Sequence, residues 1–168
     1  MSSSSPRNGE LEKRRQASLS VQCLRPTRTI DPVLYLPASQ TNRHRLINWR
    51  LHWLPGYYPW KDCRCGARAV TRDHYSLVCP LLRPLWQELT DAYGTAPSVP
   101  SGMHTIDVIL NKIPRTDVVL SNGRWPTIWP AILSILREIE RLCHPEDHLL
   151  DGEFPGDDIS LPLPSEHD

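Results

Sequence analysis

The stretch that decides the fold is residues 63–80, which spell CRCGARAVTRDHYSLVCP. It places three cysteines and one histidine within 17 residues, in the pattern C-x-C-G-x7-H-x4-C. Thiolate and imidazole ligands suit tetrahedral zinc, and four protein ligands would leave no open position for a reactive water. Gly66 lets the chain turn tightly after the second thiol, with its amide free to point at sulfur. The pattern therefore favours a structural metal site over a catalytic one.

The spacing of the first two cysteines is unusual, because Arg64 alone separates them. Zinc sites ordinarily place two or more residues between such a pair. A regular strand would hold these two residues on one face but about 6.6 Å apart along it, so a turn is needed to bring both thiols to one ion. Two interpretations stay open from the pattern: a zinc site, or three ordinary small residues beside a core histidine.

Hydrophobic spacing around this stretch predicts a mainly α-helical, small domain. We expect helices over 42–54, 71–78, 82–93, 105–112 and 130–143, whereas 117–120 is ambiguous between strand and helix. Thr71 is expected to cap the second helix, Pro130 to open the last one, and Pro55-Gly56 to end the first. These helices would surround the zinc knuckle.

The ends of the chain have a different composition. Residues 1–39 are basic, with few apolar side chains near the start and several prolines after, and 144–168 are acidic and proline-rich. We expect both to be disordered or extended. Between them, 40–93 would form a basic helix plus the zinc-knuckle region, and 94–143 the helical remainder of the same domain.

Charge divides the chain in two. The 168 residues carry 19 basic and 19 acidic side chains, but residues 1–90 hold 14 basic and 6 acidic ones, a net charge of +8. Residues 91–168 hold 5 basic and 13 acidic ones, a net charge of −8. The net charge of zero therefore excludes no class of binding partner. The basic half is typical of a polyanion-binding protein.

The sequence lacks the signals of secreted and membrane proteins, so we expect an intracellular protein that is not secreted. No apolar stretch reaches the roughly 20 residues of a membrane span, and the N-terminus lacks the apolar run of a secretory signal. The run Lys13-Arg14-Arg15 is a nuclear localisation signal, a phosphate contact or simply a solvated charge run. In this setting the five cysteines are expected to be thiols or metal ligands instead of disulfides.

One set of residues follows a known pattern, namely Cys63, Cys65, Gly66, His74, Cys79 and Pro80, then Arg83 and Trp86. It resembles the C-terminal zinc-binding region of reverse transcriptases from non-LTR retrotransposons, over roughly residues 40–145. The resemblance implies zinc as cofactor, with Cys63, Cys65, His74 and Cys79 as its ligands.

Catalytic motifs are missing from the sequence. A polymerase needs paired metal-binding aspartates on a sheet, and the only Asp-Asp pair is Asp157-Asp158 in the acidic tail. There is also no phosphate-binding loop and no nucleophile elbow. We therefore expect no enzyme activity from this chain.

The expected function is a non-catalytic zinc-knuckle module of retroelement origin that binds single-stranded RNA or DNA. Phosphates would contact the arginines and bases would stack on the aromatic rings. The candidate contact residues are Arg43, Arg45, Arg50, Arg64, Arg68, Arg72, Trp60 and Tyr75, with Tyr57 and Tyr58 nearby. The alternatives are a zinc-stabilised protein-interaction or structural module, or a non-functional retroelement remnant.

Overall fold

The protein is a small helical domain in the computed structural model, which describes residues 18, 22–25, 29–56 and 59–143. Its elements are η1 (Pro32–Leu34), α3 (Gln40–Arg50), η2 (His74–Val78), α4 (Arg83–Tyr93), α5 (Thr105–Lys112), α6 (Asp117–Leu120) and α7 (Trp125–Cys143). The described ranges contain helices and loops and no strand, as the fold prediction expected. Of the segments expected to be disordered or extended, 1–39 and 144–168, the second and residues 1–17, 19–21 and 26–28 of the first lie outside the described residues, whereas Pro32–Leu34 forms η1.

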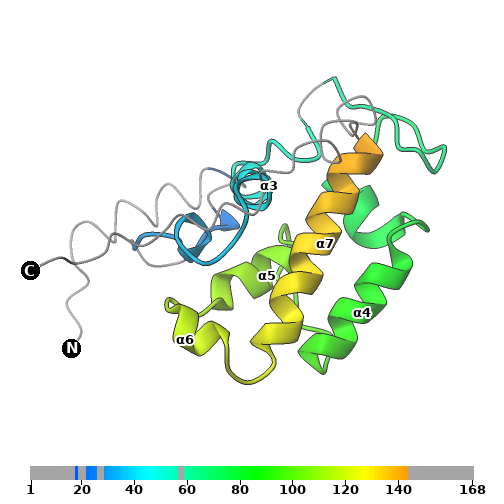
Figure 1. Ribbon diagram of the computed structural model, residues 1–168. Coiled ribbons are helices and arrows are strands. Elements are labelled where there is room, and N and C mark those ends of the chain that lie inside the picture. Colours follow the sequence, from blue (N-terminus) through cyan, green and yellow to red (C-terminus); the bar gives the residue numbers. More distant parts are fainter. Residues whose placement is uncertain (1–17, 19–21, 26–28, 57–58, 144–168) are drawn as a thin grey trace, which may run out of the picture.

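Helix α7 is the central element of the fold. It runs between α4 on one side and α3 on the other, and its first part also contacts α6 (Figure 1). Its buried side chains recur at helical spacing and include Ile128, Ile132, Ile135, Leu136, Ile139 and Leu142. This apolar stripe forms the middle of one continuous core, so α3, α4 and α6 are placed by their contacts with α7.

The start of α7 differs from the prediction. The helix begins at Trp125, and Pro130, expected at the first helical position, lies inside it. A proline interior to a helix loses one backbone hydrogen bond. Burial of Ile128 and Trp129 in this extra turn, with the Trp129 indole N–H donating to the Pro37 carbonyl over 2.9 Å, offsets that loss.

Helix α3 is shifted from its predicted range. Ser39 caps its N-terminus by accepting a hydrogen bond from the Asn42 amide, and the helix ends at Arg50 instead of Leu54. The end is a Schellman turn, in which His52 takes a left-handed conformation (φ +61°) and the Trp53 amide donates to the Asn48 carbonyl over 2.8 Å. The apolar spacing had continued across this turn, which is why the prediction ran too far.

The remaining helices agree closely with expectation. Helix α5 has the predicted bounds, and α4 starts one residue late and ends at Gly94, whose φ of +94° is a left-handed cap. The ambiguous segment 117–120 is helical and is capped by Thr116. Among the described residues, none of the helices is both long enough and apolar enough to cross a bilayer.

A buried carboxylate links three parts of this fold. Asp107 in α5 is only 1% exposed, and it accepts hydrogen bonds from the Trp49 indole (3.0 Å) and the Arg72 guanidinium (3.2 Å). Its second oxygen accepts from the His104 amide over 3.0 Å. Burial would raise the pKa of Asp107, but the bond to His104 and the charge of Arg72 outweigh it and lower the pKa. Asp107 is therefore ionised and fully paired.

We predict that Asp107→Asn destabilises the protein by about 3 kcal/mol, because it leaves the buried Arg72 charge without its partner. The free energy of unfolding in urea measures this. Asp91→Asn, at an exposed aspartate of α4, is the matched control and should cost less than about 0.5 kcal/mol. Equal losses for the two variants would show that the Asp107 charge does not stabilise the fold.

Candidate metal centre

Four side chains gather into one cluster, and they are the four predicted metal ligands. The ligand atoms of Cys63, Cys65, His74 and Cys79 all lie within 4.8 Å of one another. The first two come from a loop before η2, whereas His74 opens η2 and Cys79 follows its last residue. The structure thus brings the whole predicted set together.

The distances between these atoms match a tetrahedral zinc site. The Cys63 and Cys79 sulfurs are 3.8 Å apart, and the Cys65 sulfur is 3.4 Å from the His74 Nε2. Zinc bonds of about 2.3 Å to sulfur and about 2.0 Å to nitrogen would place two sulfurs about 3.8 Å apart and a sulfur and a nitrogen about 3.5 Å apart. The cluster therefore has the dimensions to hold a metal ion such as zinc.

A tight turn from Cys63 to Gly66 allows two cysteines separated by one residue to join the same cluster. The Gly66 amide donates to the Cys63 carbonyl over 3.0 Å, and Gly66 has a φ of +98°, where a side chain would be strained. The turn brings both thiols into the same cluster. The backbone amide that points at the Cys63 sulfur is that of Cys65, at 3.5 Å, and not that of Gly66 as predicted.

A widened helical turn brings the other two ligands together. The Cys79 amide donates to the His74 carbonyl over 2.8 Å, a bond between residues five apart that is typical of a π-turn. The helix predicted over 71–78 is helical over 72–78, mostly as this π-turn, and Thr71 is the residue directly before it. The Trp86 indole donates to the Tyr75 carbonyl over 2.9 Å and so ties the turn to α4.

The protonation states of the cluster depend on its surroundings. Burial raises the pKa of Cys63 to about 11, whereas the Ala67 amide lowers the pKa of the more exposed Cys65. Burial lowers the pKa of His74, which favours the neutral imidazole that binds metals. A bound cation would stabilise the thiolate of a buried residue such as Cys63. Metal binding at this site would therefore release the thiol proton.

The predicted nucleic-acid contacts divide into exposed and buried groups. Arg64, Arg68 and Trp60 are exposed beside the cluster. Arg43 is half-buried and donates to the carbonyls of Val33 and Leu36. Tyr57 and Tyr58 lie outside the described residues.

The other predicted contacts are buried, and the structure gives them roles within the protein. Arg45 pairs with Glu140, Arg50 with Asp31, and Arg72 with Asp107. Tyr75 is 0% exposed, and its ring meets the His74 ring edge-on with centroids 5.1 Å apart. Tyr75 therefore supports a predicted ligand and is not a surface platform for bases.

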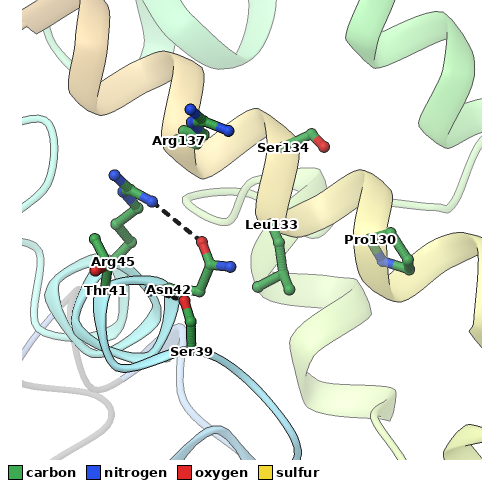
Figure 2. Close-up of a pocket in the computed structure, with 8 residues that line it drawn as sticks. All are labelled: Ser39, Thr41, Asn42, Arg45, Pro130, Leu133, Ser134 and Arg137. Atoms are coloured by element: carbon green, nitrogen blue, oxygen red, sulfur yellow. Dashed lines mark hydrogen bonds between the residues drawn. The ribbon is translucent and has the colours of Figure 1, made fainter. Parts of the chain in front are cut away.

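A polar pocket of about 340 Å³ lies between the start of α3 and the middle of α7. Figure 2 shows Arg45 reaching toward Asn42, whose side-chain oxygen accepts its hydrogen bond over 3.1 Å, with Arg137 on the facing helix. Arg45 also binds Glu140, so its charge is already balanced.

Asp107 and His104, which complete the polar cluster around Arg72, were not predicted from the sequence. The available signal was an aspartate inside the otherwise apolar run Ile106–Leu110 of a predicted helix. A charge on the buried face of a helix requires a partner. Nothing in the sequence says that this partner is Arg72, which is 35 residues away.

We predict that the purified full chain binds one zinc ion and that His74→Ala weakens zinc affinity more than about 100-fold. Loss of a ligand should exceed the 10–100-fold effect of removing an outer partner. Competition with a chromophoric chelator measures the affinity, and His44→Ala, at an exposed histidine of α3, is the matched control. Equal affinity for both variants, or no stoichiometric zinc in the parent, would contradict the site.

Comparisons of the chain with models of protein families, with curated protein sequences and with solved structures gave no match.

Proposed function

We propose that this chain is a non-catalytic zinc-knuckle module of retroelement reverse-transcriptase origin that binds single-stranded nucleic acid. The observation that carries the proposal is a Cys3His cluster of zinc dimensions with basic side chains exposed on its turn. The proposed origin rests on the Cys/His pattern and on the Pro80, Arg83 and Trp86 that accompany it. Four protein ligands fill a tetrahedral shell, which supports a structural role for the ion.

The basic side chains of the turn support a phosphate-binding role. Arg64 lies between two predicted ligands, and Arg68 follows within the same loop. Both are exposed, and neither makes a hydrogen bond or ion pair to the part of the chain that the structure describes. Two guanidinium groups on a metal-stabilised loop are well placed to contact successive phosphates of a flexible strand.

A second candidate function is protein binding, and an apolar surface next to the cluster favours it. Leu77 and Val78 of η2 are 77% and 66% exposed, and Leu81 is also exposed. Adjacent exposed apolar side chains are typical of an interaction surface. In that case zinc would only stabilise the loop that presents them.

We predict that full-length protein binds a single-stranded 12-mer with an affinity that falls steeply as salt increases. Each phosphate contact contributes about −0.7 to the slope of log affinity against log salt for single strands. Arg64→Ala and Arg68→Ala should each reduce the slope by about that amount. Fluorescence anisotropy over a salt series measures it.

The matched control is Arg124→Ala. This exposed arginine lies just before α7 and outside the loop that carries Cys63 and Cys65. It should leave the slope unchanged. Binding that does not depend on salt, or an equal effect of all three substitutions, would contradict phosphate contacts at the zinc turn. No binding at low ionic strength would contradict the proposed function and favour the protein-binding alternative.

We also predict that deleting residues 145–168 strengthens binding of the same 12-mer. This segment carries eight acidic residues and no lysine or arginine, so it competes with phosphate for basic side chains. A full-length variant with these eight residues changed to Asn or Gln is the control and should behave like the deletion. Unchanged affinity in both would show that the tail does not compete.

A further inference from the structure

A second pocket, of about 300 Å³, lies against the segment that leads into His74. It is lined by His52 from the turn after α3, Trp60 from the following loop, and Arg72 and Asp73 from the segment that leads into His74. His104 completes the wall next to α5. Because His74 directly follows Asp73, metal binding would also fix one wall of this pocket.

Arg72 lines the pocket with hydrogen-bonding capacity to spare. The residue is 8% exposed, and its Nη2 donates to Asp107, while its guanidinium carbon lies 3.7 Å from the centre of the Trp49 ring. Its Nε and Nη1 are buried and find no hydrogen-bond partner in the described part of the chain. An unpaired buried donor costs about 1–3 kcal/mol, and more when it is charged, so a ligand that accepts these bonds would be strongly favoured.

His52, which also lines the pocket, has another unpaired nitrogen. Its Nε2 is buried and has no hydrogen-bond partner among the described residues. The left-handed conformation at the end of α3 usually takes glycine, and here it directs an imidazole into the pocket wall. Burial, reinforced by the charge of Arg72, lowers the pKa of His52 to about 4, so the ring is neutral at physiological pH.

The charge balance of the pocket disfavours a phosphate as its ligand. The Arg72 charge is matched by Asp107 at 3.2 Å, and the His104 Nε2 is 2.6 Å from a carboxylate oxygen of Asp73. Hydrogen-bond donors without excess positive charge suit a neutral ligand with acceptor atoms. Trp60 adds an aromatic surface, 43% of which is exposed. Such a combination suits a planar heterocycle.

We infer that this pocket holds one unstacked nucleobase of the single strand, stacked on Trp60 and hydrogen-bonded at its edge by Arg72 and His52. The inference rests on the proposed function and adds the base contact to the phosphate contacts of the zinc turn. The volume is at the low end for small-molecule pockets, which suits one base. Purine acceptors of the kind on guanine O6 and N7 are the usual partners of arginine donors.

The first experiment separates a base from a phosphate as the ligand. Zinc-loaded full-length protein is titrated with guanosine, adenosine, cytidine and uridine, and separately with ribose 5-phosphate, while protein NMR shifts are recorded. We expect saturable shifts with at least one nucleoside, guanosine first, and none with ribose 5-phosphate. Shifts caused by ribose 5-phosphate as strongly as by any nucleoside would make the pocket an anion site, and no shift with any nucleoside would equally overturn the inference.

The second experiment tests Trp60 within the oligonucleotide complex. Stacking on an aromatic ring contributes about 1–3 kcal/mol per base, so Trp60→Ala should weaken binding of the 12-mer about tenfold, whereas Trp60→Phe should retain most of it. The matched control is Trp53→Ala, at an exposed tryptophan that does not line the pocket, and it should change affinity less than twofold. An abasic strand of equal length should bind all three variants alike.

The outcomes distinguish this inference from the proposed function. One outcome is that the parent binds the 12-mer with the expected salt dependence while Trp60→Ala and Trp53→Ala bind it with equal affinity. In that case the inference of a base pocket is wrong and the proposal of phosphate contacts remains. If the parent does not bind the 12-mer, the proposed function is wrong, and the nucleoside titration decides about the pocket on its own.

Discussion

The rest of the structure depends on the buried carboxylate of Asp107. It accepts hydrogen bonds from the Trp49 indole of α3, the His104 amide before α5 and the guanidinium of Arg72. Among the described residues, Asp107 is the only buried acidic side chain. Buried ion pairs seldom add much net stability, but they are costly to break, so they select one arrangement over others. Here the selected arrangement fixes Arg72 two residues before His74. The same contact therefore orients the helical core, the segment that leads into the Cys63/Cys65/His74/Cys79 cluster, and the wall of the second pocket.

The helices were predicted correctly where the residues that define them lie close together in the sequence. Helix α5 and the end of α4 at Gly94 follow from periodicity and capping residues within a few positions. The errors arose where a tertiary contact overrode the local signal. Packing of Ile128 and Trp129 extends α7 through Pro130, and the Schellman turn at His52 ends α3 early although apolar residues continue. Neither contact is visible from spacing alone.

The four cluster residues were predictable because three thiols and one imidazole, side chains that zinc prefers, occur within 17 residues of the sequence. What spacing could not provide was the geometry, since the C-x-C pair depends on a turn at Gly66 and the His74–Cys79 pair on a π-turn. The exposure of the candidate nucleic-acid contacts was harder to predict. An arginine has the same formal charge in any setting, so the sequence could not separate the exposed Arg64 from the buried Arg72, which has its partner 35 residues away.

That distinction changes the meaning of the charge asymmetry. The sequence divides into a basic first half and an acidic second half of equal and opposite charge. Inside the fold the halves partly neutralise each other, because Arg45 and Arg72 from the first pair with Glu140 and Asp107 from the second. The positive field of the first half is thereby concentrated on the side chains left at the surface. Two of them, Arg64 and Arg68, lie on the loop that carries Cys63 and Cys65, so the turn that places Cys63 in the core also sets the positions of these two surface charges.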